Sequence, residues 1–516
     1  MASEGNAIKQ NVGSGGNPDG AARIPGGGVE NQENGFIDVM STALDKQLAH
    51  ADNCITQQWS TAIVWRQPIH TVYVPAHWLV GEGAAPAGMQ EEHLSFRQPA
   101  TDQPTGTQPA PHQSTPEQLP AVWANYSRSA LTAAFGTRDL PAAVRKLAGE
   151  LQIQHPAEVA QLTAAKLNSQ PIEDLRIDFE DGFTQRHVAP ENRDADEDHL
   201  IPAAAAAVDG WLRPGGPAAS PTFAGIRFKS FDPGTRRRGI RTFSRFLTEL
   251  HERGTLAAIL DPRSPDYAPR ALRLTFPKVQ HPDQVRALVG VLQQVEERFG
   301  LAQVGARIPF EIQVETPQAI LGEHGAVAVT ELIEAAEGRC LSMHYGTYDY
   351  SAYLGVDATY QSLAHPVADA AKGLIQIACT GRGVELSDGS TNRIPVGGVA
   401  ELLPSWRNHR ELVTRHLQRG IRQGWDLHPN QLVTRHLATI EYFRVSAQEC
   451  IERTRDYVRG DTTTWMDEPA TAKAMAGYLV RAHDCGAITP AEFAETGVSM
   501  ADMQQLRATG RLDFEG

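Results

Sequence analysis

The sequence has few cysteines and no long apolar run. Its five cysteines, Cys54, Cys340, Cys379, Cys450 and Cys485, are scattered and form no CxxC pair, so they indicate neither a thiolate metal site nor a disulfide framework. No stretch of about 18 apolar residues is present, which argues against a membrane-spanning helix. The N-terminus lacks the charged and apolar segments of a secretory signal. These absences favour a cytoplasmic protein.

Positive charge is also scarce. The chain has 47 Lys and Arg against 61 Asp and Glu, which gives a net charge of −14. A phosphate backbone would repel such a chain, so we expect no nucleic-acid partner, although a local basic pocket for an anionic substrate stays compatible. With 516 residues, 41% hydrophobic and 21% charged, the composition is that of a globular protein with a large core.

Several well-known catalytic motifs are missing. The chain has no GxxxxGK[ST], no HExxH, no GxSxG and no GxGxxG after an expected strand. Hydrolysis of ATP by a P-loop, zincin chemistry and α/β-hydrolase chemistry are therefore disfavoured.

The chain divides into three parts by composition. Residues 1–34 are rich in Gly and Asn and are expected to form a flexible tail, because they offer too few apolar side chains to offset ordering entropy. Residues 35–431 alternate between apolar runs and amphipathic stretches, after a helix expected over Ile37–Gln57. They include an insertion around 80–165, in which 98–120 is dense in Pro, Gln and Thr and reads as a loop or disordered segment. Residues 432–516 are expected to be a helical C-terminal extension.

Eight short apolar runs are spaced like strands: His70–Val74, Leu175–Phe179, Phe223–Phe228, Leu272–Phe276, Phe310–Val314, Cys340–His344, Val384–Leu386 and Trp425–Leu427. Helices are expected between or after them, among them Arg237–Arg253, Pro282–Phe299, Pro317–Glu337 and Trp406–Arg422, and in the C-terminal part Leu432–Val458, Thr464–His483 and Pro490–Thr509. Alternating strands and helices predict a parallel sheet, and eight strands predict an α/β fold of the closed (β/α)8 type, a TIM barrel.

Polar residues follow these runs in order. They are Asp178, Glu180 and Asp181 after the second run, Arg227, Lys278 and Glu315 at the third to fifth, Gly346, Thr347, Tyr348 and Asp349 after the sixth, Asp388 after the seventh and His428 after the eighth. Successive positions lie between 34 and 51 residues apart, which fits one strand–helix unit each. Because the carboxyl ends of barrel strands converge on one mouth, these side chains are expected to share one cavity.

Such a grouping has a chemical use. Glu315 and Asp349 follow adjacent strands and could bind one Mg²⁺, which takes one or two protein carboxylates and keeps several waters. Asp178, Glu180 and Asp181 could hold those waters. Arg227 could face the negative charge of a developing enolate.

Each residue alone also fits a structural role. Asp181 could belong to a turn, Glu315 could end a strand before a helix start, and Arg227 could simply pair with Glu180. His428 followed by proline could begin a helix. For any single position the structural interpretation is the more common one, and the functional one depends on the set.

Together these motifs resemble the citrate lyase beta-subunit and HpcH/HpaI aldolase superfamily, which includes malyl-CoA lyases, and more distantly the malate synthases. The match runs from about 70 to 431 and includes Asp-Phe-Glu-Asp-Gly at 178–182, Pro-Lys at 277–278, Glu-Thr-Pro at 315–317 and His-Pro-Asn-Gln at 428–431. The resemblance implies an oligomeric barrel that uses Mg²⁺ or Mn²⁺ to make or break a carbon–carbon bond beside a carbonyl. The third run reads Arg-Phe-Lys at 227–229, where family members often have Arg-x-Asn.

The resemblance assigns roles to the strand-end residues. Glu315 and Asp349 match the family's metal ligands, Arg227 matches its arginine at the reacting oxygen, and Asp178, Glu180 and Asp181 match its acidic motif, which would act in catalysis. From their positions at the strand ends, Lys278 is also expected to act in catalysis, and Gly346, Thr347, Tyr348, Asp388 and His428 are expected to bind substrate. The expected substrate is a small 2-oxo- or 3-hydroxy-acid, or its CoA thioester, cleaved through a metal-stabilised enolate by a homo-oligomer. Two alternatives stay open: a malate-synthase-like condensation of an acyl thioester with a 2-oxo acid, and a barrel without catalysis that serves as a binding scaffold.

Overall fold

The structure is a computed structural model that describes residues 28–59, 61–79, 116–185, 188–217, 219–461 and 467–512. The chain forms two compact units, Met1–Ser60 and Thr61–Gly516. In the first unit, helix α1 (Gly28–Trp59) includes the helix expected over Ile37–Gln57. Residues 28–34 of the expected tail belong to α1, and residues 116–120 of the segment expected as a loop form a 3-10 turn (Pro116–Gln118) and the start of helix α3, so both expectations are wrong at these ends. Residues 1–27 and 80–115 lie outside the described residues, and the flexibility expected there stays a prediction.

Eight parallel strands form one sheet in the second unit, as expected. They are β1 (His70–Pro75), β2 (Asp174–Asp178), β3 (Phe223–Arg227), β4 (Leu272–Phe276), β5 (Phe310–Val314), β6 (Cys340–Tyr345), β7 (Glu385–Ser387) and β8 (Gly424–Asp426). The strand order is β7-β6-β5-β4-β3-β2-β1-β8. A parallel bridge between Ser387 and Gln423 joins the two ends of this order, so the sheet closes into a (β/α)8 barrel.

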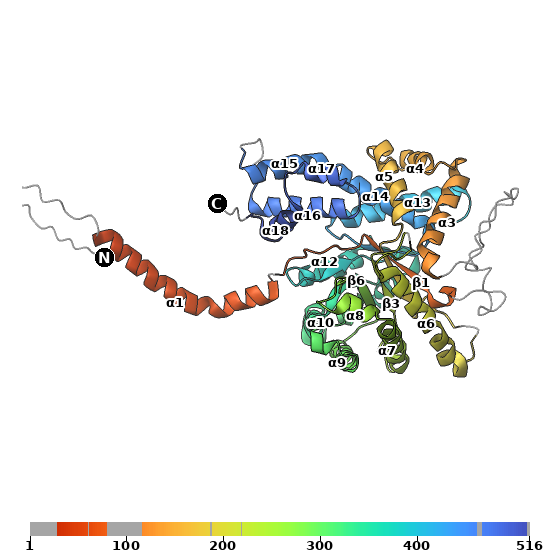
Figure 1. Cartoon of the computed structure of the whole chain (residues 1–516), viewed down its shortest axis with the longest axis horizontal. Coiled ribbons are helices and arrows are strands. Elements are labelled where there is room, and N and C mark those ends of the chain that lie inside the picture. Colours follow the sequence, from red (N-terminus) through yellow and green to blue (C-terminus); the bar gives the residue numbers. More distant parts are fainter. Residues whose placement is uncertain are drawn as a thin grey trace, which may run out of the picture. The chain divides into compact units, whose positions relative to one another are not determined.

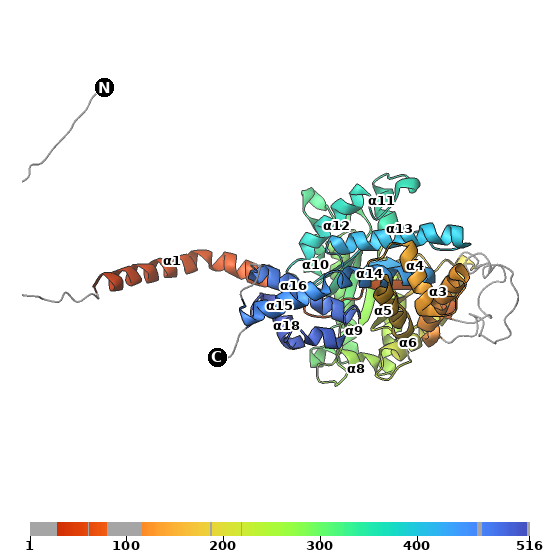
Figure 2. The same cartoon turned by 90° about the horizontal axis from the view of Figure 1, so that it is seen from above.

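Helices follow the strands along the chain: α3 (Leu119–Phe135), α4 (Leu140–Glu150) and α5 (Pro156–Ser169) before β2, α6 (Arg193–Leu212) before β3, α7 (Arg236–Glu252) and α8 (Thr255–Leu260) before β4, α9 (Pro282–Arg298) before β5, α10 (Ala328–Ala335) before β6, α11 (Thr347–Tyr353) and α12 (Pro366–Cys379) before β7, and α13 (Val399–Gln418) before β8. Figures 1 and 2 show where these helices lie, with α11 labelled in Figure 2. Parallel strands require such crossover connections, because the chain must return to the same end of the sheet.

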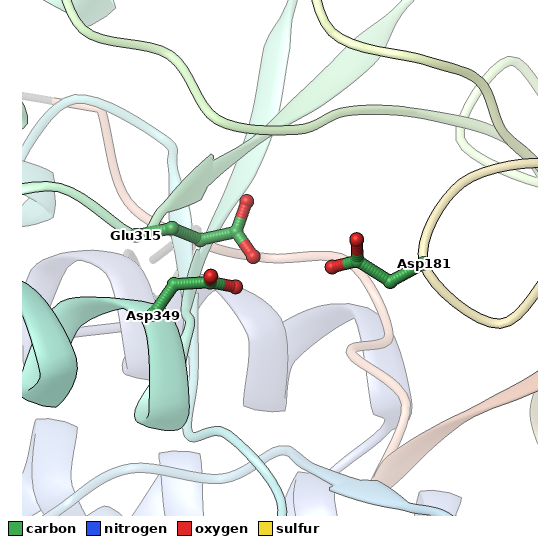
Figure 3. A group of neighbouring side chains, drawn as sticks. All are labelled: Asp181, Glu315 and Asp349. Carbon is green, nitrogen blue, oxygen red and sulfur yellow. The ribbon is translucent and has the colours of Figure 1, made fainter.

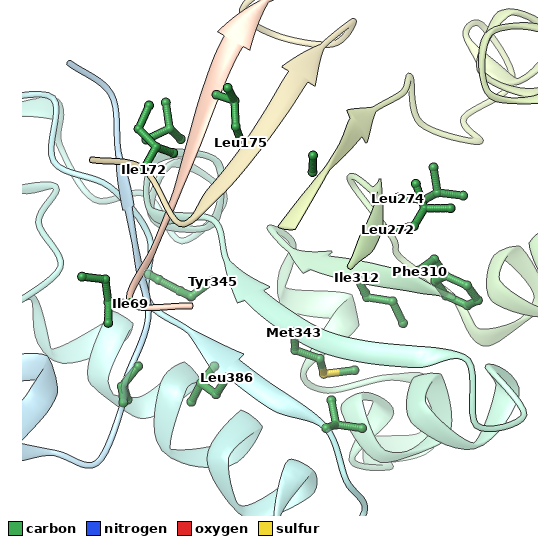
Figure 4. Close-up of a cluster of buried hydrophobic side chains, with 14 of the residues drawn as sticks. Ile69, Ile172, Leu175, Leu272, Leu274, Phe310, Ile312, Met343, Tyr345 and Leu386 are labelled. Atoms are coloured by element: carbon green, nitrogen blue, oxygen red, sulfur yellow. The ribbon is translucent and has the colours of Figure 1, made fainter. Parts of the chain in front are cut away.

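Alternate residues along each strand face opposite sides of the barrel wall. Apolar side chains such as Leu175, Ile312 and Met343 are buried (Figure 4). The residues between them are polar and meet across the barrel: Arg176 on β2 donates to both carboxylate oxygens of Glu311 on β5, each at 2.7 Å, although both side chains are fully buried. The apolar residues therefore face the helices, and the barrel axis is lined by charge rather than by the bulky aliphatic layers usual in this fold.

Further hydrogen bonds satisfy the buried ion pair of Arg176 with Glu311. Arg176 also donates to Asp174 at 2.6 Å and to Thr275 at 2.7 Å, and Glu311 accepts from Ser342 at 2.9 Å. Burial alone would raise the pKa of Glu311, but Arg176 and nearby His344 hold that pKa well below its usual range. Arg176 and Glu311 directly precede the carboxyl ends of β2 and β5. Their hydrogen bonds therefore help to fix the positions of the residues that follow on these two strands.

Five further helices follow the barrel: α14 (Leu432–Arg444), α15 (Ala447–Arg459), α16 (Pro469–Asp484), α17 (Pro490–Ala494) and α18 (Met500–Thr509). Helix α14 packs on α5 and α13, and α16 packs on α15 and α18 (Figures 1 and 2). They belong to the same compact unit as the barrel. The expected domain boundary after Gln431 therefore stays a prediction.

Some helices differ from the sequence expectation. The segment expected as one helix over Pro317–Glu337 is a 3-10 turn, Pro317–Ala319, and then α10, because Gly322 and Gly325 interrupt it. The expected Leu432–Val458 helix is broken at Ser446, whose backbone is not helical. Helix α13 begins at Val399 and keeps Pro404 inside, where a start after the proline was expected. In the described part of the chain no helix has both the length and the apolar character needed to cross a bilayer.

Candidate active site and metal centre

Three carboxylates meet at the carboxyl ends of the strands. Glu315 follows β5, Asp349 lies in the first turn of α11 after β6, and Asp181 lies in the loop after β2. One carboxylate oxygen of each lies within 4.8 Å of the others, and Figure 3 shows Asp181 facing the other two from across the site. The barrel thus brings together residues that are up to 168 positions apart in the sequence.

Glu315 is the buried member of this cluster, with a residue exposure of 2%. Its Oε2 accepts a hydrogen bond of 2.8 Å from the backbone N–H of Lys278 at the end of β4. Gly346 leaves the space that the Glu315 side chain needs, because a Cβ on Gly346 would lie 2.3 Å from Glu315 Cγ. The glycine expected to bind substrate therefore has a visible packing role beside the metal cluster.

Arg227 at the end of β3 is fixed by Asp178 at the end of β2. Its Nε and Nη2 donate to the two carboxylate oxygens of Asp178 at 2.7 and 2.6 Å, and both residues are buried. Nη1 remains, and it lies 3.4 Å from Gln313 Oε1 and 3.5 Å from Glu180. Asp178 therefore fixes the orientation of the Arg227 guanidinium at the carboxyl ends of the strands.

Lys278 connects the acidic loop to the metal cluster. Its Nζ donates to Glu180 at 2.8 Å and to Asp181 at 2.7 Å, while its backbone holds Glu315. Its φ of +52° is in the left-handed region, which is uncommon for a residue with a side chain. Such conformations often mark functional sites, and here it lets one residue bond with both its backbone and its ammonium.

The electrostatics follow from this crowding of charge. Burial raises the pKa of Glu315 to about 8, an effect that Arg227 opposes and that Glu180 and Asp349 reinforce. Burial also raises the pKa of Glu180 above its usual range. In Asp181 burial is outweighed by Arg227 and by the hydrogen bond from Lys278, so its pKa is lowered. A carboxyl whose pKa is raised by burial, and further by nearby carboxylates, indicates a place where a cation would be stabilised.

Two aromatic residues at the mouth were not identified from the sequence. The Arg227 guanidinium lies 4.8 Å from the ring centre of Tyr73 on β1 and 5.3 Å from that of Trp425 on β8. The two rings are 4.5 Å apart. Trp425 Nε1 is buried and has no partner among the described residues. Both residues, and Gln313 on β5, occupy the axial face of their strands, which is a signal that alternation along the strand could have given.

The expected substrate-binding residues have other contacts. Thr347 Oγ1 donates to the carbonyl of Ser390 at 3.2 Å, and the hydroxyl of Tyr348 accepts from the backbone N–H of Asn392, so both contact the loop after β7. Asp388 pairs with the buried Lys372 at 2.9 and 3.0 Å. His428 Nδ1 accepts from the backbone N–H of Asn430 at 3.1 Å, and burial lowers its pKa to about 4. Their role in substrate binding stays a prediction.

The donor set fits a hard divalent cation. All three groups are carboxylates, the ligand type that Mg²⁺ and Mn²⁺ prefer. Oxygens on one Mg²⁺ are about 3–4 Å apart, because each lies about 2.1 Å from the ion. A separation of up to 4.8 Å is slightly wider, which is compatible with one carboxylate acting through a water. The sequence placed Asp181 among the residues that hold waters, and its position agrees with either role.

A family described as a domain of unknown function (DUF6986) matches residues 48–511. The chain belongs to this family. The match of DUF6986 covers the barrel and the C-terminal helices, so both are parts of the same family unit. No curated protein matches the chain.

Solved structures that are similar to this DUF6986 chain include enzymes of the groups named above. A citrate lyase from Burkholderia xenovorans LB400 has 19% identity over 67% of this chain and 94% of that chain, with a TM-score of 0.44. A magnesium/glyoxylate complex of Haloferax volcanii malate synthase has 13% identity over 86% and 97%, with a TM-score of 0.41. The CitE protein of Mycobacterium tuberculosis, in complex with magnesium and acetate, has 14% identity over 60% and 89%, with a TM-score of 0.33.

Proposed function

We propose that this protein is a divalent-metal-dependent carbon–carbon lyase or aldolase. Its substrate would be a small 2-oxo- or 3-hydroxy-acid, or the CoA thioester of such an acid. The observation that carries the proposal is the cluster of Asp181, Glu315 and Asp349 beside the fixed guanidinium of Arg227.

The role that we propose for each residue of the site follows from its charge. Glu315 and Asp349, with Asp181 directly or through a water, would hold Mg²⁺ or Mn²⁺, which when bound supplies a Lewis acid for the oxygens of a carboxylate or carbonyl substrate. Arg227 Nη1 makes only long contacts, to Gln313 at 3.4 Å and to Glu180 at 3.5 Å, and through it Arg227 would stabilise the negative charge of an enolate as the carbon–carbon bond breaks. The energy of this interaction is large because the guanidinium is buried and already oriented by Asp178.

The aromatic pair closes one side of this site. Tyr73 and Trp425 pack against the same guanidinium and exclude water from it. Water exclusion protects an enolate from protonation by solvent and strengthens its attraction to Arg227. The arrangement therefore supports enolate chemistry better than it supports a passive binding surface, because buried charges of this number are costly without a ligand.

Calorimetric titration of Mg²⁺ and Mn²⁺ tests the metal site. We expect the wild type to bind with measurable heat, and the double variant Glu315→Gln/Asp349→Asn to lose that binding. Asp283→Asn, which removes an exposed carboxylate at the start of α9, is the matched control and should bind like the wild type. Equal affinity in all three proteins would refute the site.

Proton exchange at the alpha carbon of pyruvate or an acyl thioester, followed by NMR with metal present, tests the chemistry. Exchange that disappears in the double variant supports enolate formation. Release of free thiol on mixing an acyl thioester with a 2-oxo acid would instead assign the condensation reaction. An absence of proton exchange across a broad panel of such compounds would favour the alternative of a barrel without catalysis that serves as a binding scaffold.

A further inference from the structure

Three arginines gather at the end of the barrel opposite the acidic cluster. Arg422 lies just before β8, at the amino end of that strand, Arg481 lies in α16, and Arg507 lies in α18. Arg507 is buried, with 8% exposure, and the other two are half-buried. We name Arg422, Arg481 and Arg507 the basal arginine cluster.

Two of these guanidinium groups converge over a glycine. A Cβ placed on Gly477 in α16 would lie 3.4 Å from Nη1 of Arg481 and 3.9 Å from Nε of Arg507. Glycine inside a helix is less stable than alanine would be. At this position it leaves room for two like charges to approach the same stretch of backbone.

The hydrogen-bonding capacity of the basal arginine cluster is largely unused. Arg481 donates to the carbonyl of Gly477 at 3.4 Å, and Arg507 to Gln504 at 3.5 Å, which are both long. Arg422 donates to Leu417 and Tyr442 at 3.3 and 3.0 Å. The Nε atoms of Arg422 and Arg481 are buried without a partner among the described residues. A guanidinium has five N–H donors, so most of them stay available.

The basal arginine cluster also lacks a close ion-pair partner in the described part of the chain, although Asp484 attracts both Arg481 and Arg507 from a longer distance. No carboxylate of the described residues lies within 4.0 Å of any of the three guanidinium groups. Asp484 and Glu385 attract Arg507 from further away. Glu385, however, already accepts from Trp65 at 2.6 Å and Arg270 at 3.2 Å.

The clustering has an electrostatic signature. Burial, and after it repulsion by Arg507 and Arg422, lowers the pKa of Arg481 to about 9. Tyr442 and Asp484 are the neighbours that oppose this shift. Burial also lowers the pKa of Arg507, and Arg422 contributes to that shift by repulsion.

We propose that the basal arginine cluster binds a phosphate group, either as free phosphate or as a phosphate ester. Convergent guanidinium groups match the oxygens of a phosphate, and a dianion would supply the close ion-pair partner that the three arginines lack. The ligand would connect α16 and α18 to the segment before β8. The site would therefore fasten the C-terminal helices to the base of the barrel, independently of the chemistry at the mouth.

Thermal unfolding and calorimetry of the full-length chain test this proposal at constant ionic strength. We expect low-millimolar inorganic phosphate to raise the Tm in a saturable manner and to bind with measurable heat, whereas chloride does neither. Glycerol 3-phosphate is the second arm, and the tighter of the two ligands identifies the source. A rise in Tm that does not saturate would be a general salt effect and would overturn the proposal.

Arg481→Met is the decisive variant. Because it removes one of three mutually repelling charges, its Tm without phosphate should equal or exceed that of the wild type, while its phosphate affinity falls at least tenfold. Arg444→Met is the matched control: Arg444 in α14 pairs with Glu492 at 2.7 Å, so this variant should lose Tm and keep the phosphate response. Phosphate binding that is unchanged in Arg481→Met, or an Arg481→Met protein destabilised as much as Arg444→Met, would refute the site.

Discussion

The Lys278 ammonium lies 2.7 Å from a carboxylate oxygen of Asp181, in the same cluster that faces Glu315 and Asp349. A cation of the protein thus already neutralises one of the groups that would hold the metal. Lys278→Met should therefore tighten Mg²⁺ binding about tenfold, or ~1.4 kcal/mol, because the ion no longer competes with the ammonium. Calorimetric titration measures this, and Lys229→Met, whose ammonium bonds the Phe179 carbonyl at 2.6 Å, is the control expected to stay near wild type. Weaker binding in Lys278→Met would mean that Lys278 only supports the site.

Arg227→Lys should reduce both stability and turnover. Lysine cannot reproduce the two parallel hydrogen bonds to Asp178, and it leaves that buried carboxylate poorly satisfied. We expect a loss of about 3–5 kcal/mol in the free energy of unfolding and a fall of about 10²–10³-fold in alpha-proton exchange. Arg213→Lys changes an arginine whose side chain is 55% exposed and should alter neither quantity by much. Normal exchange in Arg227→Lys would remove the arginine from the mechanism.

Gly346→Ala should disturb the metal site through contact alone. Its new Cβ would lie 2.3 Å from Glu315 Cγ, so the Glu315 side chain must move. We expect destabilisation of about 1–3 kcal/mol and weaker Mg²⁺ binding, measured by denaturant unfolding and calorimetry. Gly373→Ala is the control, because no atom lies within 4 Å of its new Cβ and alanine favours the surrounding helix α12. If both variants bound Mg²⁺ like wild type, the close approach at Gly346 would be without consequence for the metal.

Glu173, next to the start of β2, should give the protein a stability that is lost in acid. Burial would raise its pKa, but Arg66 at 2.9 Å and Lys166 at 2.6 Å hold the pKa well below the usual range. A depressed folded-state pKa adds stability that is present above the unfolded value, about 4.3, and is lost as pH falls below it. Glu173→Gln should therefore lose about 3–5 kcal/mol at pH 7 and less at pH 3. Unfolding measured across this range checks it, and an equal loss at both pH values would contradict the linkage.

The strands are predictable from the sequence to within one residue at every end. Runs such as Leu272–Phe276 and Phe310–Val314 coincide with β4 and β5, because a short apolar run bounded by turn residues is typical of a buried strand. Their spacing then predicted a closed barrel, and barrel topology alone brings Glu315 next to Asp349. This part of the site depends on the ends of strands, which sequence patterns locate well.

Other parts depended on contacts that no local pattern encodes. The pairing of Arg176 with Glu311 across the axis joins residues 135 positions apart, and neither residue differs from an ordinary exposed charge in its own neighbourhood. Trp425 looked like part of an apolar run, yet its ring packs on Arg227. The helix break at Gly322 and Gly325 was visible in the composition, but the apolar residues around it favoured a continuous helix.

The barrel closes where its two shortest strands, β7 and β8, meet. Each has three residues, and the wall there is completed by the bridge of Ser387 with Gln423 and by two backbone bonds: Asp388 N–H to the Gln423 carbonyl at 2.8 Å, and Trp425 N–H to the Gly389 carbonyl at 3.1 Å. A β-barrel opens most easily between strands that share few backbone hydrogen bonds, because few bonds must then be broken. Solvent would then first reach the barrel interior between β7 and β8. The loop after β7, which contacts Thr347 and Tyr348, would become more mobile at the same time. The extended pairing of β2 with β3 would stay intact.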